Sequence, residues 1–345
     1  MSNNQLEVRK FIIEQIEKHP SDIVKMVVNN FSISRQRANF YVSNEVKNGT
    51  LIRVGVTRNS RYFLLGGKHF EFISKITSTL SDDYIWMKYV KQMLKNCPSN
   101  VISACAYGFT EMFNNAIDHS QGNLIYTEIN IENGIVNLNI LDNGIGIFRK
   151  IQNALNLESE REAILHLSKG KFTTDPTKHT GEGIFFTSRI FDRFSIFSDD
   201  LYYAFENRDW MISPEKQEKI GKGTVIRMSL SLNPEIQVSD IFKKYADSDI
   251  GFFKTIVSVG LSADPGDPHV SRSQAKRLLL GLEKFRHVIL DFKGVESVGQ
   301  AFVDQVFRVF TNEYPNIKIQ YVNANPEVEL MIQRGLPEGE NLKLE

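Results

Sequence analysis

The sequence predicts a multidomain α/β protein. Its 345 residues are 41% hydrophobic and 24% charged, a balance typical of a globular chain long enough for two or three domains with separate cores. Three blocks of different character follow one another: short helical patterns with two strands, then mixed helices and strands, then strands that alternate regularly with helices. We expect domains at 1–67, 68–233 and 234–345.

Composition and charge limit the partners and the cellular compartment that the sequence predicts. Lysine plus arginine equals aspartate plus glutamate at 41 each, so the net charge of zero indicates no class of partner. The two cysteines, Cys97 and Cys105, are too few for a disulfide framework or a cysteine-rich metal site, which fits a reducing compartment. No apolar run approaches the roughly 18 residues that span a bilayer, and the N-terminus lacks the pattern of a signal peptide. We expect a soluble cytoplasmic protein.

The first block carries its positive charge in one half. It contains three helical patterns, at residues 5–18, 21–31 and 34–47, and two strands, LIRV and RYFLL, before Gly66 and Gly67 end it. Residues 1–34 carry four basic and four acidic groups, whereas residues 35–65 carry six basic groups against Glu45 alone. Such a surplus on the third helix and the strands is what contact with phosphates requires.

This block resembles a winged helix-turn-helix, with FSISRQRANFYVSNEVKNGTLIRV as the recognition helix and the first wing strand. The resemblance implies DNA binding through residues 1–65. Side chains near the start of the third helix would reach base edges, and wing side chains would hold the backbone: Arg35, Gln36, Arg37 and Asn39, and Arg58 and Arg61. The alternative is a protein-docking or dimerisation module with a solvated basic face.

The second block contains a helical pattern with aligned polar groups. Within residues 103–119, a predicted buried stripe recurs at spacings of three and four: Phe109, Met112, Phe113, Ala116 and Ile117. Glu111, Asn115 and His119 stand four apart on a neighbouring face. Taken alone, such a face is more often simply solvated, so further motifs are needed to indicate a site.

Two glycine motifs follow this helix. In LDNGIGI, Asp142 ends an apolar strand before Gly144 and Gly146, where a carboxylate could accept a hydrogen bond from an exocyclic amine, although a plain turn fits equally well. In HTGEGIFFTSRIFD, Gly181 and Gly183 lead into a helix whose free N–H groups suit phosphate. The stretch between the motifs, LSKGKFTTDPTKH, has the composition of a mobile phosphate-covering loop.

The three motifs together resemble the Bergerat-fold GHKL superfamily of ATPases and kinases over residues 75–232. They are most similar to its anti-sigma-factor serine kinases and to histidine-kinase-like ATPases. The resemblance implies an α/β sandwich that binds ATP and Mg²⁺, with Glu111 as the catalytic base and Asn115 as the magnesium ligand. The other nucleotide-contacting residues it implies are Asp142, Gly144, Gly146, Lys171, Thr180, Gly181, Gly183 and Thr224. Two residues depart from the pattern: Glu182 lies between the lid glycines, and Phe185 stands where many relatives have a third glycine.

The third block runs strand, helix, strand, helix, strand, helix, and Ser271 with Gln274 has the spacing of a capping box. HVILDFKGVESVGQAF resembles the STAS-like domains of the anti-sigma-factor antagonists. At the phosphoacceptor position of that family this chain has Gly299-Gln300-Ala301, and Ser297 is out of register, so phosphotransfer is not expected. We expect a docking or regulatory domain for a protein partner, or alternatively a structural domain that stabilises a homodimer.

Together these features predict a DNA-binding transcriptional regulator that binds and hydrolyses ATP. Ordering of the lid between Phe148 and Thr180 would control domain docking and DNA affinity. The enzyme expected is a magnesium-dependent ATPase or, as the alternative function, a serine/threonine protein kinase of the anti-sigma-factor type. A histidine kinase is disfavoured because no helical hairpin with a phosphoacceptor histidine precedes the motifs.

Overall fold

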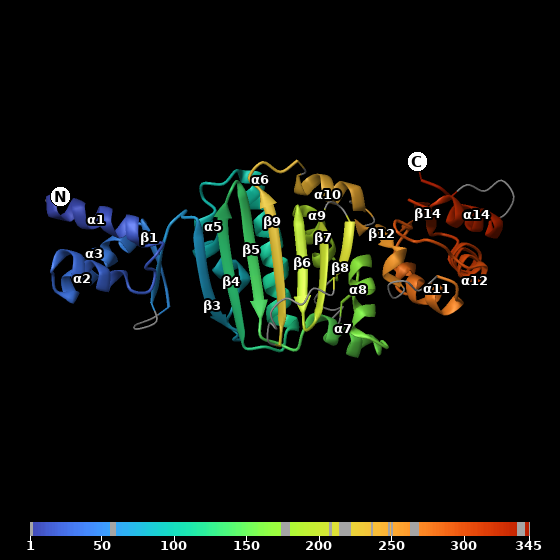
Figure 1. Ribbon diagram of the computed structural model, residues 1–345, viewed down its shortest axis with the longest axis horizontal. Coiled ribbons are helices and arrows are strands. Elements are labelled where there is room, and N and C mark those ends of the chain that lie inside the picture. Colours follow the sequence, from blue (N-terminus) through green and yellow to red (C-terminus); the bar gives the residue numbers. More distant parts are fainter. Residues whose placement is uncertain are drawn as a thin grey trace. The chain divides into compact units, whose positions relative to one another are not determined.

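A computed structural model of the chain describes most of its residues (Figure 1). The described residues are 3–55, 60–173, 180–206, 209–213, 222–235, 237–247, 249, 251–262, 269–336 and 342–344. They form several sheets with helices around them, which confirms the mixed α/β multidomain class. Two compact units divide the chain: Met1–Asn143 with Val225–Glu235, and Gly144–Thr224 with Ile236–Glu345. In the described part, no helix is both long enough and apolar enough to cross a bilayer.

The first unit begins with three helices and a two-stranded hairpin. Their bounds are Asn3–Gln15 for α1, Ile23–Phe31 for α2, Arg35–Lys47 for α3, Leu51–Val54 for β1 and Arg61–Leu64 for β2. The three helices and both strands share one buried core, formed by Val8, Ile12, Ile16, Ile23, Val27, Ala38, Tyr41, Val42, Leu51 and Tyr62. The predicted helices and strands are confirmed within a few residues, and their common core explains why such short elements are stable.

A packed turn joins this hairpin to the sheet of the first unit. Gly66 has φ +72°, and a Cβ there would lie 2.7 Å from Asn96 Nδ2, so the position favours glycine. Beyond the turn, Phe63 on β2 packs edge-on against Phe70 on β3 (His69–Lys75), with ring centroids 4.8 Å apart. Gly66 and Gly67 therefore form a tight connection between β2 and β3.

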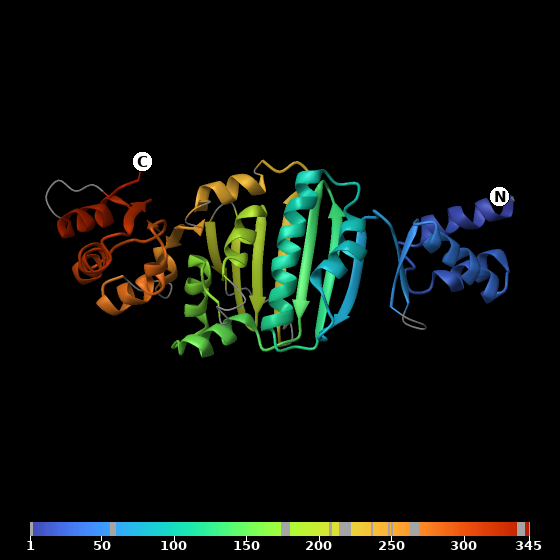
Figure 2. The same ribbon diagram turned by 180° about the vertical axis from the view of Figure 1, so that it is seen from behind.

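The sheet of the first unit contains β3, β4 (Leu124–Glu132), β5 (Ile135–Asp142) and, from Val225 on, β9 (Thr224–Ser231), in that order. The pairs β3–β4 and β4–β5 are antiparallel. Helix α6 (Ser99–His119) contacts β4 and β5, and Figure 2 shows it lying along one face of these strands. Three short helices precede it: α4 (Asp82–Ile85), η2 (Trp86–Val90) and α5 (Lys91–Met93).

The amino-terminal part of the second unit contains three helices and an antiparallel sheet of the order β6-β7-β8. Their bounds are Ile147–Leu155 for α7, Glu160–Lys169 for α8, Gly183–Ile190 for α9, Arg193–Ser198 for β6, Leu201–Glu206 for β7 and Asp209–Ser213 for β8. The predicted mobile loop at 167–179 is wrong for its first three residues, which form the buried last turn of α8. Its polar composition misled because Ser168 and Lys169 point into the protein.

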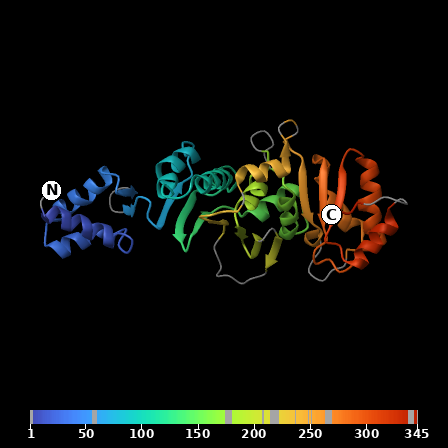
Figure 3. The ribbon, with the colours of Figure 1, turned by 90° about the horizontal axis from the view of Figure 1, so that it is seen from above.

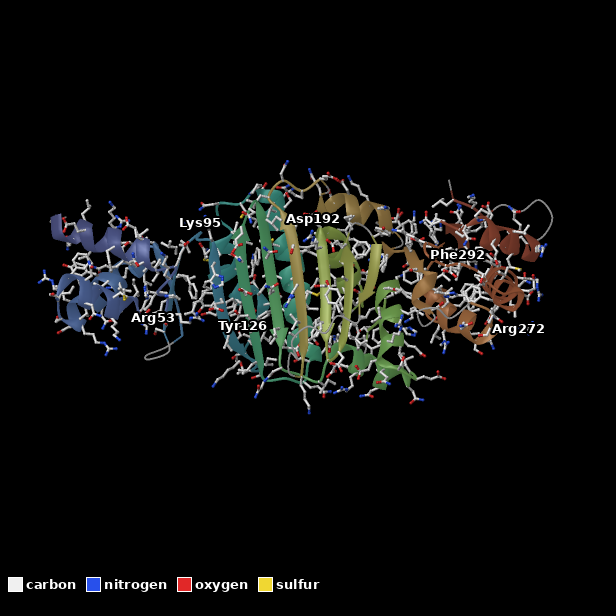
Figure 4. The ribbon with its side chains drawn as sticks, in the orientation of Figure 1. Arg53, Lys95, Tyr126, Asp192, Arg272 and Phe292 are labelled. Carbon is white, nitrogen blue, oxygen red and sulfur yellow. The ribbon has the colours of Figure 1, made fainter. Side chains whose placement is uncertain are left out.

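The carboxyl-terminal part of the second unit is an α/β domain around a parallel sheet of the order β12-β13-β14. The strands are Lys254–Ser258, His287–Asp291 and Lys318–Val322, and they run side by side in Figure 3. Leading into it are α10 (Val238–Tyr245), β10 (Ala246–Asp247) and β11 (Gly251–Phe252). Phe292, labelled in Figure 4, is fully buried in this domain.

Helices connect these parallel strands as the sequence predicts. Between β12 and β13 lie η3 (Val259–Ser262), α11 (Arg272–Leu279) and η4 (Leu282–Lys284). Between β13 and β14 lies the run α12 (Gln300–Val303), η5 (Asp304–Val309) and α13 (Phe310–Glu313), and α14 (Pro326–Gly335) follows β14. The predicted capping box is confirmed, because the Ser271 hydroxyl accepts from the Gln274 N–H and the Gln274 side chain accepts from the Ser271 N–H. A crossover helix between parallel strands is the usual way to connect them.

Candidate functional site

Helix α6 carries the first candidate residues. Its apolar stripe is buried as predicted at Phe109, Met112, Phe113 and Ala116. Glu111 and Asn115 lie four residues apart on a half-buried flank, so their side chains stand one above the other. The side chain of Asn115 has no hydrogen-bond partner among the described residues, so its amide is available for a ligand.

Strand β5, on which α6 packs, ends in the second candidate. Asp142 is 6% exposed and pairs in register with Ile125 on β4. The following residue fixes this strand end, because Asn143 Oδ1 accepts hydrogen bonds from the backbone N–H groups of Asn123 at 2.9 Å and Leu124 at 3.0 Å. The end of β5 that carries Asp142 is therefore fixed to the start of β4 through the side chain of Asn143.

The first glycine turn lies in the second unit. Gly144 is buried, and Gly146 has φ +89° with no room for a Cβ, which would lie 2.6 Å from Ser198 Oγ and 3.1 Å from Asp199 Oδ2. The hydroxyl of Thr224 accepts a hydrogen bond from the Ile147 N–H at 3.0 Å. Thr224 therefore holds the turn at the start of α7, and the glycine at 146 is required by both its backbone angle and its neighbours.

The second glycine turn leads into α9. A Cβ on Gly181, whose φ is +74°, would lie 2.4 Å from the carbonyl oxygen of Phe172. Gly183 is the first residue of α9, so the first N–H groups of that helix lack intrahelical acceptors. Thr180, immediately before the turn, is exposed.

Glu182 and Phe185, which depart from the pattern of the resembled superfamily, are both held by contacts within the second unit. Burial raises the pKa of Glu182, and the nearby charge of Lys171 opposes this rise. Phe185 is 1% exposed, with its ring centroid 4.5 Å from that of Phe252 and 5.1 Å from that of Tyr245. A glycine in place of Phe185 would remove this packing between α9 and the carboxyl-terminal part of the unit.

The lysine predicted to contact nucleotide is engaged elsewhere. Lys171 donates from Nζ to the carbonyl oxygen of Lys284 at 2.9 Å, and its ammonium lies 4.9 Å from the ring centroid of Phe285. Burial lowers the pKa of Lys171, against the opposing effect of Glu182. A nucleotide contact by Lys171 would require this side chain to exchange partners.

Sequence analysis missed a neighbouring lysine. Lys169 is 2% exposed, although lysine is almost never fully buried, and burial lowers its pKa from 10.5 to about 7. Burial also lowers the pKa of His166, one turn earlier on α8, to about 3. No local signal in the sequence separates Lys169 from Lys171, because both look like residues of a solvated loop.

The residues present suit a magnesium nucleotide in their chemistry. In the described part of the chain, no group of three or more His, Cys, Asp and Glu side chains could hold a metal ion. Mg²⁺ needs no such group, because it keeps waters and phosphate oxygens as ligands and takes few from the protein. The side-chain amide of Asn115, which has no hydrogen-bond partner among the described residues, fits a ligand of this kind.

The exposed face of α3 carries most of the candidate DNA contacts. Arg35, Gln36, Arg37 and Asn39 are all exposed near the helix start, where the hydroxyl of Ser34 caps the helix by accepting from the Arg37 N–H. The one acidic residue in this region, Glu45, is 6% exposed and pairs with Arg9 of α1 at 3.2 Å. Its charge is therefore turned inward, which leaves the basic surplus on the surface.

An exposed aromatic residue on the same face escaped the sequence analysis. Phe40 is 56% exposed, between Asn39 and the buried Tyr41. Apolar side chains in the major groove contact thymine methyl groups. The alternating polar pattern of α3 could have revealed Phe40, because it lies four residues after Gln36 on the polar face.

The two wing arginines differ. Arg58 lies outside the described residues. Arg61 forms an ion pair with Glu71 of β3, and its guanidinium carbon lies 5.6 Å from the ring centroid of Phe63. Glu71 also accepts a hydrogen bond from the hydroxyl of Tyr126, which Figure 4 labels on the sheet. Arg61 is therefore tied to the sheet and would have to leave this pair to contact a phosphate.

Comparison with protein families matches residues 274–329 to the STAS-like domain of unknown function DUF4325. The match begins within α11 and ends within α14, so a STAS-like domain lies in the carboxyl-terminal part of the chain, as the sequence predicted. Comparison with curated proteins finds no match.

Gly299, the first residue of the run Gly299-Gln300-Ala301, packs closely against the backbone of a neighbouring segment. A Cβ on Gly299 would lie 2.7 Å from the Cα and 2.8 Å from the carbonyl oxygen of Val270. His269 holds this segment in place, because its Nε2 is 2.9 Å from the Val259 carbonyl oxygen and its ring packs against Phe302. A serine or threonine at 299 would therefore collide with the backbone of Val270.

Proposed function

We propose that this protein is an ATP-binding, DNA-binding transcriptional regulator in which nucleotide state changes DNA affinity. One observation carries the proposal: α6 presents Glu111 and, one turn later, the Asn115 side chain, which has no partner among the described residues, and the strand beneath α6 ends in the buried Asp142. A carboxylate, an amide and a second, buried carboxylate on two packed elements are the groups that a magnesium nucleotide needs from a protein.

Each residue has a role under this proposal. Asp142 accepts a hydrogen bond from the exocyclic amine of adenine, and Asn115 ligates the metal. Glu111 orients the attacking water and takes its proton. The turns at Gly144–Gly146 and Gly181–Gly183 line the nucleotide, with Thr224 fixing the first of them. Bound magnesium would supply charge neutralisation for the phosphates.

The contacts of the first unit support a link between nucleotide and DNA. Asp142 ends β5, β5 pairs with β4, and Tyr126 of β4 donates to Glu71 of β3. Glu71 in turn pairs with Arg61 of the amino-terminal hairpin. A ligand at Asp142 thus has a continuous packed path to the basic face, although it shifts DNA affinity only as far as it favours one of two states.

Calorimetry with Mg·ATP tests the nucleotide site. The wild-type protein is expected to bind, and Asp142→Ala to bind at least about 100-fold more weakly, because a buried partner of the base is lost. Asp83→Ala, which removes an exposed carboxylate in α4, serves as the control and should bind normally. No heat of binding to folded wild-type protein would remove the proposal.

Turnover tests the role of Glu111. Glu111→Ala should still bind Mg·ATP but release phosphate about 10²–10⁴ times more slowly, the usual contribution of a general base. Turnover equal to that of the wild type would remove the assignment. Radiolabelled ATP distinguishes the two enzyme classes: released phosphate without labelled protein supports the ATPase, and a base-stable phosphoester on a protein supports the serine kinase.

Electrophoretic mobility shift with a non-hydrolysable ATP analogue tests the regulatory part. DNA affinity is expected to change when the analogue binds. Replacing Arg35 and Arg37 together by Glu should weaken DNA binding and lower the slope of log affinity against log salt by about two. The matched control, Lys276→Glu with Lys318→Glu, gives the same net charge from exposed positions of the STAS-like domain. Equal loss in both double variants would mean a non-specific charge effect.

A further inference from the structure

The end of α8 is bound to the STAS-like domain by a buried lysine. Lys169 donates from Nζ to the carbonyl oxygens of Arg277 at 3.1 Å and Leu280 at 2.8 Å. These carbonyls lie at the carboxyl end of α11, where Leu280 is the C-cap. Carbonyls at a helix end lack intrahelical donors and carry negative partial charge, so Lys169 caps α11 from another part of the unit.

The same short segment is held through its backbone. The hydroxyl of Thr255 on β12, 0% exposed, donates to the carbonyl oxygen of Lys169 at 2.7 Å. At the next residue, Gly170, φ is +78° and a Cβ would lie 2.7 Å from the ring of Phe252. Lys171 then donates to Lys284, as described above. Three consecutive residues are therefore fixed by the carboxyl-terminal part of the unit.

The segment held in this way lies directly against the second glycine turn. Phe172, one residue after Lys171, has its backbone nitrogen, carbon and oxygen within 2.6 Å of where a Gly181 Cβ would stand. The backbones of the two segments are therefore in contact, with no side chain between them. A shift of residues 169–172 has to move the turn at 180–183 or break this contact.

We infer that Lys169 is a positioning residue through which the STAS-like domain sets the conformation of the Gly181–Gly183 turn. This inference rests on the proposed function for the role of the turn in binding phosphates. The domain thereby regulates nucleotide affinity: whatever displaces the end of α11 releases Lys169, and the turn loses its support. Regulation through a buried contact of this kind needs no phosphorylation of the STAS-like domain.

Hydrogen–deuterium exchange of the full-length, nucleotide-free protein tests the contact without relying on nucleotide binding. Lys169→Met removes the donor and keeps the apolar stem, and Thr255→Val removes the hydroxyl from the other side. Both are expected to speed amide exchange at residues 180–183 by about fivefold, the effect of losing about one hydrogen bond. The double variant should speed exchange at residues 180–183 little more than either single variant does, because both substitutions remove support from Lys169.

Two matched variants separate this role from general destabilisation. Lys276→Met changes an exposed lysine of α11, and Ile319→Val loosens the core of the same domain on β14. Neither should change exchange at residues 180–183. Equal acceleration in Ile319→Val, or none in both Lys169→Met and Thr255→Val, overturns the inference.

Calorimetry with Mg·ATP on the same variants completes the test. If wild-type protein binds, Lys169→Met and Thr255→Val should each weaken binding severalfold while Ile319→Val does not; unchanged affinity in both overturns the regulatory part. If wild-type protein does not bind Mg·ATP, the proposed function fails, while faster exchange at 180–183 in the two variants still supports the positioning role of Lys169.

Discussion

The amino-terminal hairpin and the STAS-like domain are each joined to a neighbouring part of their own unit by a basic side chain, but in opposite ways. Arg61 meets a carboxylate, Glu71, and the two side chains are 38% and 17% exposed. Lys169 forms no ion pair with a carboxylate in the described part of the chain: it is 2% exposed and donates to two backbone carbonyls. The first contact is a partly exposed ion pair. In the second contact, a buried amine caps the carboxyl end of α11.

This difference determines what can change each contact. A partly exposed ion pair contributes little to stability and weakens with salt, so DNA phosphates could compete with Glu71 for Arg61. A buried lysine is screened very little, and its hydrogen bonds depend on the position of α11. We therefore expect the first contact to respond to ionic conditions and the second to movement of the domain.

Removal of Lys169 should produce the largest effect. Lys169→Ala leaves a cavity and takes the donor away from the carbonyls of Arg277 and Leu280, which is expected to lower the free energy of unfolding by about 3 kcal/mol. Lys276→Ala, at an exposed position of α11, should change it by less than about 0.5 kcal/mol. Urea unfolding measures both; similar small losses would mean that Lys169 is not a structural contact.

The pH dependence of stability should be the next largest effect. Burial lowers the pKa of Lys169 to about 7 from 10.5, despite the nearby charge of Glu283. Below pH 7 both the folded and the unfolded chain hold this proton. Between about pH 7 and 10.5 the unfolded chain binds a proton that the folded chain has lost, so the free energy of unfolding rises by about 1.4 kcal/mol per pH unit.

The comparison variant for this measurement is Lys169→Met, which should lack the rise. The difference between the two pH curves reports on Lys169 alone. His166, with its pKa near 3, is neutral throughout this pH range, and Glu283 and Lys284 are present in both proteins. If the free energy of unfolding of the wild type ran parallel to that of Lys169→Met between pH 7 and 10, the pKa of Lys169 would not be lowered. The neutral amine keeps two N–H groups for its two carbonyls, so the contact itself persists above pH 7.

The two contacts also differ in how far the sequence could predict them. The strand LIRV, the buried stripe of α6 and the capping box at Ser271 followed from periodicity and residue type, because each depends on neighbours within a few positions. The STAS-like domain was predicted from the resemblance of HVILDFKGVESVGQAF to a known family, which the match to residues 274–329 supports. Long-range partners leave no such local signal.

Lys169 and Phe185 illustrate this limit. Lys169 lies in a polar stretch, yet α11, which buries it, is more than 100 residues further along the chain. Phe185 departs from the expected glycine because it packs on Phe252 and Tyr245, which belong to a later part of the chain. The predicted nucleotide and DNA contacts of the site residues remain predictions that the experiments above address.

Loss of the surface ion pair should have the smallest effect. Glu71→Gln keeps an acceptor for Tyr126 but removes the charge facing Arg61, and a partly exposed pair of this kind is worth about 0.5 kcal/mol. Burial alone would raise the pKa of Glu71, but Tyr126 and Arg61 hold it below its ordinary value of 4.5. Its contribution is therefore complete above pH 4.5 and is lost as the pH falls through the lowered pKa.

Salt separates this pair from the buried contact. Raising the ionic strength to about 1 M shortens the screening length to about 3 Å, which should bring wild-type protein and Glu71→Gln to equal stability at neutral pH. The same salt should leave the gap between wild-type protein and Lys169→Ala almost unchanged. If salt closed both gaps, Lys169 would be acting through charge rather than through hydrogen bonds, and the distinction between the two contacts would be wrong.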